Sequence, residues 1–415
     1  MVNAEPPLVL PFRGERFAGR DLSARLAPPY DVIAPDERRA LAARDLHNIV
    51  HLILPEAGVE RDQYLHAAAL LAEWRRAGVL IRDPAPAVYV LEQAFPLPAG
   101  GTRTRVGLFA AVAAEPYDAG RVRPHERTHA GPKADRLALL RATATALESI
   151  FLLAPDAGGD LTRALAGVTR GAPSAEGTLD GVRHRLWIVT GAAADALAAS
   201  AGRAPLYIAD GHHRYETAVA YAKEHPAADR VLSLIVPATD PGLTVLATHR
   251  VVYGIGFDLS PLLGQWQQWF AVTATPPLAD PVGHLAVAGA QGTACVVALP
   301  DGRDLTLVLR SDAPLGEISV LGKSLAARSL DVSIVEALVV KPILGAGTST
   351  PTLTYTPDAA KALEAARRGR AAAAVLLNPT RVAQVIDVAD AGDVMPQKST
   401  YFVPKVPAGL VLRPV

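Results

Sequence analysis

Along most of this 415-residue chain, short apolar segments alternate with longer segments that have the spacing of amphipathic helices. This alternation restricts the fold to the mixed α/β class, because strands must share a sheet and helices must cover its faces. We expect strands at 47–55, 151–155, 206–210 and 230–238, a β-hairpin formed by 87–97 and 102–115, and helices at 61–78 and 133–150. The sequence thus predicts a mixed sheet core with helices packed on it.

From about Asp258 the pattern changes, and hairpin and helix signals follow in closer succession. Residues 293–310 predict a second hairpin around Asp301 and Gly302, with Cys295 in a buried strand. We expect three parts: a catalytic, nucleotide-binding α/β region at 1–255, a smaller α+β subdomain at 256–344, and a C-terminal segment, 345–415, that returns to the first region.

Composition excludes several classes of protein. The formal net charge is zero, so no basic surplus indicates nucleic acid as a partner. No segment approaches the roughly 18 uninterrupted apolar residues of a membrane span, and none is expected. The single cysteine, Cys295, cannot form an intrachain disulfide, so a cytoplasmic location is expected.

The most unusual stretch is Asp210-Gly211-His212-His213-Arg214, between an apolar strand and a helix. Free backbone N–H groups and the helix dipole favour an anion at such a junction. Gly211 allows close backbone approach, Arg214 and a histidine suit phosphate oxygens, and Asp210 suits a divalent metal or a base. The alternative is a solvent-facing turn in which Asp210 only caps the helix.

A second polar segment, residues 123–136, contains His125-Glu126-Arg127-Thr128-His129 and so matches the H-E-x-x-H signature of zinc proteases. That signature requires a helix, which Pro124, Gly131 and Pro132 argue against here. We favour an ordered loop leading into a helix at Lys133 that presents donors to a polyanionic ligand. A solvated, charged loop is the alternative.

Three further segments are candidates of lower specificity. Residues 26–39 hold Tyr30 and Asp31 in a proline-rigidified loop, which an ordinary turn explains equally well. His249-Arg250 interrupts a strand pattern, as a surface pair also would. The tail 395–405 supplies Lys398, Ser399, Thr400 and Lys405 as donors, although such tails are usually only exposed.

These segments together resemble a prokaryotic family catalogued as a domain of unknown function. The resemblance rests on PFRGERF (11–17, with Arg13), APPYDVI (27–33), HERTHAGPKADR (125–136), ADGHHRYETA (209–218), THR (248–250) and MPQKSTYFVPK (395–405). The DGHHR element is similar to the phosphate-binding box of the ParB/sulfiredoxin superfamily, some of whose members are free-serine kinases. The resemblance implies a ParB/sulfiredoxin-like nucleotide element within the α/β fold.

A small-molecule kinase is the function that the resemblance and the residues imply together, using ATP or ADP with Mg²⁺ to phosphorylate free L-serine or a similar hydroxyl. The expected partners are therefore a nucleotide and a small amino acid. Two alternatives stay open: a ParB-like nucleotide-binding regulator without catalysis, and a metal-dependent hydrolase or lyase.

The expected site residues fall into four groups, and Glu126, Asp210, His213, Arg214 and Lys398 are expected to line one cleft. Catalytic roles go to Glu126, Asp210 and His213, and Mg²⁺ would bind Asp210. Phosphate binding goes to Gly211, His212, His213, Arg214, Lys133, Arg136 and Thr128. Substrate binding goes to Tyr30, Asp31, Arg13, His249, Arg250, Lys398, Ser399 and Thr400.

Overall fold

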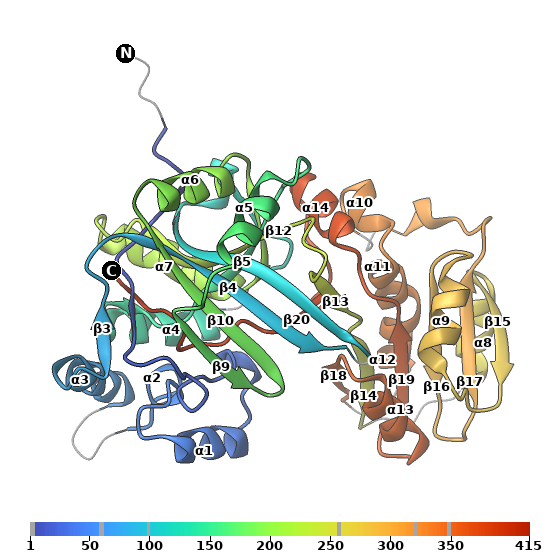
Figure 1. The fold of residues 1–415 in the computed structure, drawn as a ribbon. Coiled ribbons are helices and arrows are strands. Elements are labelled where there is room, and N and C mark those ends of the chain that lie inside the picture. Colours follow the sequence, from blue (N-terminus) through green and yellow to red (C-terminus); the bar gives the residue numbers. More distant parts are fainter. Residues whose placement is uncertain are drawn as a thin grey trace. The chain divides into compact units, whose positions relative to one another are not determined.

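The computed structural model describes residues 5–57, 62–97, 100–128, 130–254, 259–318, 322–346 and 350–415. The chain divides into two units (Figure 1). The first unit comprises the described residues up to Thr244 together with Pro404–Val415, and the second unit is Val245–Val403. We had expected the smaller part at 256–344. The second unit extends further at both ends, and only the last twelve residues, not 345–415, belong to the first unit.

A mixed sheet forms the centre of the first unit, as the alternating pattern predicts. In the described residues it has nine strands in the order β6-β11-β8-β12-β5-β4-β10-β9, with β1 paired to β5. Their bounds are β1 Val9–Leu10, β4 Ala87–Pro96, β5 Thr102–Ala113, β6 Val122–Arg123, β8 Ile150–Ala154, β9 Ala175–Leu179, β10 Val182–Thr190, β11 Leu206–Asp210 and β12 Arg230–Pro237. The predicted hairpin is confirmed, because β4 and β5 pair antiparallel from Tyr89 opposite Phe109 to Pro96 opposite Thr102. Two neighbouring pairs are parallel, β6 with β11 and β8 with β12.

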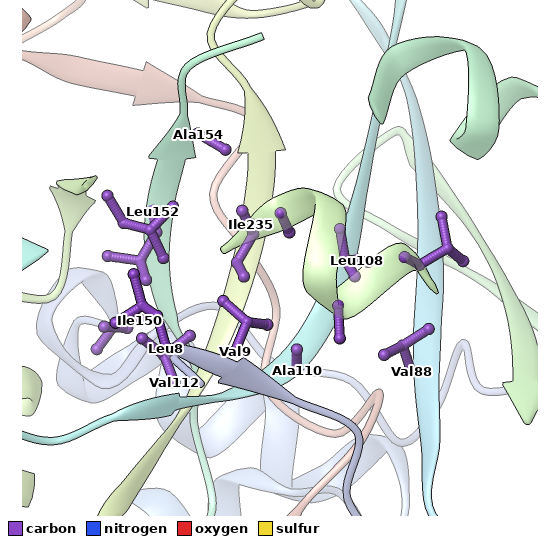
Figure 2. Packing of buried hydrophobic residues seen from close by; sticks show 14 of the residues in the cluster. Leu8, Val9, Val88, Leu108, Ala110, Val112, Ile150, Leu152, Ala154 and Ile235 are labelled. Carbon is purple, nitrogen blue, oxygen red and sulfur yellow. The ribbon is translucent and has the colours of Figure 1, made fainter. Parts of the chain in front are cut away.

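Helices and short strands surround this sheet. The helices are η1 Tyr30–Val32, α1 Pro35–Arg44, α2 Val50–Ile53, α3 Gln63–Arg76, η2 Tyr117–Ala119, α4 Ala130–Thr143, α5 Asp160–Val168, α6 Gly191–Ala201 and α7 His212–Glu224. The short strands are β2 Glu15–Phe17, β3 Leu80–Arg82, β7 Thr145–Ala146 and β21 Arg413–Pro414. Aliphatic side chains of β1, β4, β5, β8 and β12 form one buried cluster (Figure 2), to which α5, α6 and α7 add their apolar faces. Burial of this apolar surface stabilises the sheet that carries the site.

The strand expected at 47–55 is wrong, because Val50–Ile53 forms the short helix α2. The run is buried on all sides, so its apolar character reports burial rather than a strand period. Asn48 decides the conformation: its side-chain oxygen accepts from Val50 N–H at 2.9 Å, and its amide donates to the carbonyls of Ala24 and Leu26. The two bonds to these carbonyls reach across more than twenty residues of sequence.

A six-stranded sheet, counted over the described residues, forms the second unit, in the order β15-β17-β16-β19-β14-β18 with every pair antiparallel. Its strands are β14 His249–Tyr253, β15 Phe270–Thr275, β16 Ala294–Ala298, β17 Asp304–Leu309, β18 Thr352–Thr356 and β19 Ala373–Leu377, and β13 Thr244–Leu246 pairs separately with β20 Tyr401–Val403. Its helices are α8 Leu259–Gln267, α9 Pro281–Gly289, η3 Leu315–Glu317, α10 Leu325–Arg328, α11 Asp331–Val335, η5 Glu336–Val340, α12 Lys341–Ala346, α13 Ala359–Arg367 and α14 Val382–Asp390.

Both faces of this second sheet are covered. Cys295 and Val297 of β16 pack into a cluster with Trp266 and Leu338, while Val296 packs into another with α9 and α13. The predicted hairpin at 293–310 is confirmed as β16 and β17, and Cys295 is fully buried, as expected. No helix among the described residues combines the length and the apolar character that crossing a membrane requires.

Candidate functional site

Two parallel strands of the first unit, β6 and β11, end side by side. β6 leads through residues 124–128 into α4, and β11 leads through Gly211 into α7, which packs against α4. The carboxyl ends of parallel strands meet at one edge of a sheet, and ligands of α/β proteins bind preferentially there. Residues 124–128 and 210–214, both singled out by the sequence, therefore lie together, and we call them the strand-end site.

Two buried histidines join the halves of this site. The His125 ring donates through Nδ1 to the carbonyl of Ile208 at 2.7 Å, its backbone N–H donates to Nε2 of His212 at 3.3 Å, and the two rings lie edge to face with centroids 4.7 Å apart. Burial lowers the pKa of His125 to about 4 and holds the pKa of His212 well below its usual range. Both rings are therefore neutral near pH 7. His212, which the sequence analysis expected to bind phosphate, is instead buried against His125.

The zinc-protease arrangement is not formed by the described part of its motif. Residues 125–128 are not helical, and His129 lies outside the described residues. α4 begins at Ala130, earlier than the Lys133 that we expected, and takes Pro132 into its first turn, where a proline is tolerated. Among the described residues, no group of three His, Cys, Asp or Glu side chains is arranged to hold a metal ion.

Gly211 makes the turn from β11 into α7 possible. Its φ of 92° is in the left-handed region, and a Cβ there would lie 3.0 Å from Ile150 Cγ2. Gly211 is also the N-cap residue of α7, and no side chain caps the helix there. The first N–H groups of a helix have no partner within it, so this end of α7 favours an anion.

Arg214 is built into the protein more deeply than the sequence suggested. Its side chain is 10% exposed and donates to the Ser149 carbonyl and, at 3.4 Å, to Oδ2 of Asp210. Burial lowers the pKa of Arg214, but attraction to Asp210 and Glu148 outweighs this and leaves the pKa raised. Two of the five N–H donors of this guanidinium are therefore used by protein groups.

Glu148, which the sequence analysis missed, brings the Tyr30-Asp31 segment to the same site. Its carboxylate accepts from Tyr30 N–H at 3.0 Å and lies 3.5 Å from Nη1 of Arg136. Burial raises the pKa of Glu148, opposed by Arg214 and Arg136. Arg136 stacks over the Tyr30 ring at 4.1 Å and donates to the Ile53 carbonyl, so it organises the site from beneath. Asp31 is exposed.

Glu216 on α7, also missed, gathers two of the expected phosphate ligands. Its Oε2 accepts from the Thr128 hydroxyl at 2.8 Å and from Lys133 Nζ at 2.7 Å. The side chain of Glu126, which lies between His125 and Thr128 in the sequence, is half-buried. Glu148 and Glu216 both fall inside expected helices, although α4 ends at Thr143, before Glu148. A lone acid in an alanine-rich segment was the only sequence signal for either.

Lys405 reaches the strand-end site from the returning C-terminal segment. Its Nζ lies 3.6 Å from Oδ2 of Asp210, the same oxygen that Arg214 contacts, so two cations lie beside this carboxylate. Asp210 and His213 are each half-buried. Arg13, by contrast, is exposed and donates to the Asp83 carbonyl.

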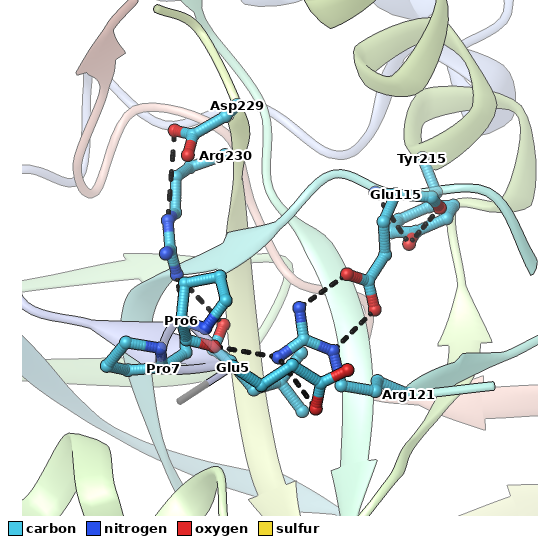
Figure 3. A network of polar contacts seen from close by, with 9 residues as sticks. Glu5, Pro6, Pro7, Glu115, Arg121, Tyr215, Asp229 and Arg230 are labelled. Carbon is cyan, nitrogen blue, oxygen red and sulfur yellow. Dashed lines mark hydrogen bonds and ion pairs between the residues drawn. The ribbon is translucent and has the colours of Figure 1, made fainter. Parts of the chain in front are cut away.

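A polar network fixes the start of α7 to the segment before β6 (Figure 3). The Tyr215 hydroxyl donates to the Glu115 carbonyl at 2.7 Å, and the Glu115 carboxylate accepts from Arg121, which in turn donates to the Pro6 carbonyl at 2.8 Å. Because Arg121 immediately precedes β6, this network holds both halves of the strand-end site in register.

Two cavities border the site. One of about 70 Å³ lies behind it, lined in part by Arg136, Glu148 and Arg214, and is too small for a nucleotide. The other, of about 600 Å³, is lined in part by Tyr117 and Glu216 and has the size of a small-molecule site.

The remaining expected residues belong to the second unit and are described within it. His249 is buried, and its Nδ1 accepts from Leu377 N–H. Arg250 is 2% exposed, pairs with Glu336 at 3.3 Å and lies over Tyr355, so it is a core residue rather than a surface pair. Ser399 is buried and donates to the Pro396 carbonyl, Lys398 is exposed with a φ of 55°, and Thr400 is half-buried.

Known structures with a similar fold were found at low identity. A conserved hypothetical protein from Pyrococcus furiosus is 13% identical, with a TM-score of 0.36, over 73% of this chain and 93% of its own. A free serine kinase in complex with AMP is 13% identical, with a TM-score of 0.37, over 72% and 87%. SbnI with a C-terminal truncation, from Staphylococcus aureus, is 11% identical, with a TM-score of 0.37, over 72% and 84%.

No curated protein matches the sequence. A family model, in contrast, matches residues 9–333, which is most of the chain and includes residues 124–128 and 210–214 but not Lys405. The chain therefore belongs to the family described as "Protein of unknown function (DUF1015)".

Proposed function

We propose that this protein is a small-molecule kinase that transfers a phosphoryl group from ATP or ADP to the hydroxyl of free L-serine or a similar acceptor. The observation that carries the proposal is the strand-end site itself. It combines an uncapped helix N-terminus at Gly211 with a half-buried carboxylate, Asp210, beside two cations. Phosphoryl transfer needs positioned positive charge and a proton acceptor more than a covalent nucleophile.

In the proposed reaction, the acceptor oxygen attacks the terminal phosphorus, the bond from that phosphorus to the nucleotide oxygen breaks, and the hydroxyl proton passes to a carboxylate. Asp210 is the first candidate for this base, because it lies at the turn that holds the anion. Glu126 and the exposed Asp31 are the other candidates. The phosphates would meet the first turn of α7, with His213 beside it.

Mg²⁺ would arrive with the nucleotide. The described residues supply no ready group of three ligands, but Mg²⁺ is often held by one or two carboxylates together with substrate phosphates. Asp210 is the carboxylate placed for this, although its two cationic neighbours weaken its attraction for a metal. Within the second unit, the burial of His249, Arg250 and Ser399 favours structural roles for these three residues.

The decisive experiment is phosphoserine formation by the purified chain with L-serine, Mg²⁺ and ATP or ADP. Asp210→Asn should lower turnover roughly a hundredfold if Asp210 is the base, within the range of general-base catalysis. Asp160→Asn, at an exposed position on α5, is the matched control and should be unchanged. Glu126→Gln and Asp31→Asn test the other two carboxylates in the same assay.

Two outcomes would replace the proposal. Nucleotide binding without any turnover, across a panel of amino acids and other hydroxyl acceptors, would indicate a regulatory nucleotide-binding protein. Product formation with no nucleotide present would indicate a hydrolase or lyase.

A further inference from the structure

The returning C-terminal segment is held by two buried side chains in the middle of the large sheet. Gln93 on β4 and Arg105 on β5 face each other across the antiparallel pair. Gln93 Nε2 donates to the Lys405 carbonyl at 3.2 Å, and Arg105 Nη2 donates to the Pro404 carbonyl at 2.7 Å. The backbone at Pro404 and Lys405 is therefore fixed by neighbouring donors.

Arg105 is an unusual residue to place there. It is 1% exposed, its guanidinium lies 4.6 Å from the ring of Phe151, and burial lowers its pKa to about 9, against the attraction of Asp240 and Asp210. Burying an arginine costs free energy unless good partners compensate. Together with Gln93, Arg105 fixes the backbone from which the Lys405 side chain extends.

This arrangement fixes the position of Lys405. Its ammonium lies 3.6 Å from Asp210 and its side chain is 19% exposed. An ion pair of this length near the surface contributes little to stability, too little to account for a buried arginine beneath it. Two further cations of the site, Arg214 and Lys133, bond to the Ser149 carbonyl and to Glu216. A lysine on a flexible stem can turn from Asp210 to an incoming phosphate oxygen.

We propose that Lys405 is the cation that contacts the terminal phosphate of the bound nucleotide, and that Gln93 and Arg105 are positioning residues that hold it beside Asp210. This inference rests on the proposed nucleotide site. It adds a binding residue from outside the DGHHR segment, more than 190 residues along the chain.

Isothermal titration of the full chain with ADP and with adenosine tests Lys405. Lys405→Met should weaken ADP binding tenfold or more and leave adenosine binding unchanged, because only ADP carries the phosphates. Lys405→Arg should keep most of the ADP affinity. Lys361→Met, which removes an exposed lysine of the second unit, is the charge-matched control. Unchanged ADP affinity in Lys405→Met would overturn the proposal.

The positioning role needs a readout that a purely structural role would not move. Gln93→Met keeps the size of the side chain and removes its N–H donor. Arg105→Lys keeps the positive charge but removes the planar set of N–H donors of the guanidinium. Both should lower the ratio of ADP to adenosine affinity several-fold. A lower melting temperature with an unchanged ratio would show that they only support the fold. If Arg105→Lys does not fold, Gln93→Met decides the question.

The two proposals fail in different ways. If the wild-type protein binds ADP but forms no phosphorylated product, and Lys405→Met loses the ADP affinity, the kinase proposal is wrong and the Lys405 proposal holds. If wild-type protein binds neither ADP nor pyrophosphate, the Lys405 proposal is overturned as well.

Discussion

The two units bury charge beneath their sequence motifs in different ways. In the first unit, parallel strands β6 and β11 end together, and neutral histidines and an ion network pack under a partly exposed carboxylate. In the second, Arg250 lies within β14 of an all-antiparallel sheet and is enclosed by Glu336, Tyr355 and the Thr248 carbonyl. A buried arginine is thus no mark of a site by itself. Parallel strands collect separate loops and helix N-termini at one edge, which an antiparallel sheet does not do.

Acid should separate the two units most strongly. The first unit buries His125 and His184, with pKa values lowered to about 4 and about 3, and His212, whose pKa is also lowered; the second buries His249, at about 4. Below pH 6.5 the unfolded chain takes up protons at these rings and the folded chain does not. The free energy of unfolding therefore decreases as the pH is lowered, until the pKa of the folded state is reached. Each of His125, His184 and His249 should remove about 2 kcal/mol between pH 7 and pH 5, and His212 acts in the same direction.

The first unit, with two such rings and His212, should therefore lose more than about 4 kcal/mol over this range and the second about 2 kcal/mol. The protein is equilibrated in urea at each pH and then labelled briefly by hydrogen exchange at one fixed pH. Mass spectrometry of the labelled peptides then measures the unfolding of each unit separately. Equal losses in both would mean that the three histidines of the first unit are accessible to protons without unfolding.

Arg250→Ala tests whether the second unit's arginine is structural. Removing one partner of a buried pair leaves the other uncompensated, so the second unit should lose about 3–5 kcal/mol of unfolding free energy. Arg303→Ala, which breaks an exposed pair with Asp301 in the same unit, is the control and should cost far less. Urea unfolding compares them, and similar costs for the two variants would contradict the comparison.

The smallest expected effect concerns two glycines, one in each unit. Gly211 and Gly254 both have left-handed φ values, 92° and 78°, which cost a residue with a Cβ about 1 kcal/mol or more. A Cβ at Gly211 would also press on Ile150 at 3.0 Å, whereas at Gly254 the nearest atom is 3.5 Å away. Gly211→Ala should therefore cost about 2–3 kcal/mol and Gly254→Ala about 1 kcal/mol. Thermal unfolding of both variants measures the difference; a larger loss for Gly254→Ala would contradict the tight packing at the turn.

Much of the fold could be predicted because it is local. The β4–β5 and β16–β17 hairpins join segments that are close in sequence and carry their own turn residues, so pattern alone identified them. The bounds of the second unit could not be found in this way. β14 pairs with β18 and β19, which follow it by about a hundred residues, and no local signal records that pairing.

The candidate site divides along the same line. The sequence by itself determined the glycine turn at 211 and the polar segments around 125 and 210, because conformational freedom and polarity belong to single residues. Only the tertiary structure decided which of those side chains face inward. His212 and Arg214 are committed to His125 and Ser149, while Glu148, Glu216 and Lys405 enter the site from elsewhere. Burial and partners depend on which strands become neighbours, and that is a property of the packed sheet rather than of any segment.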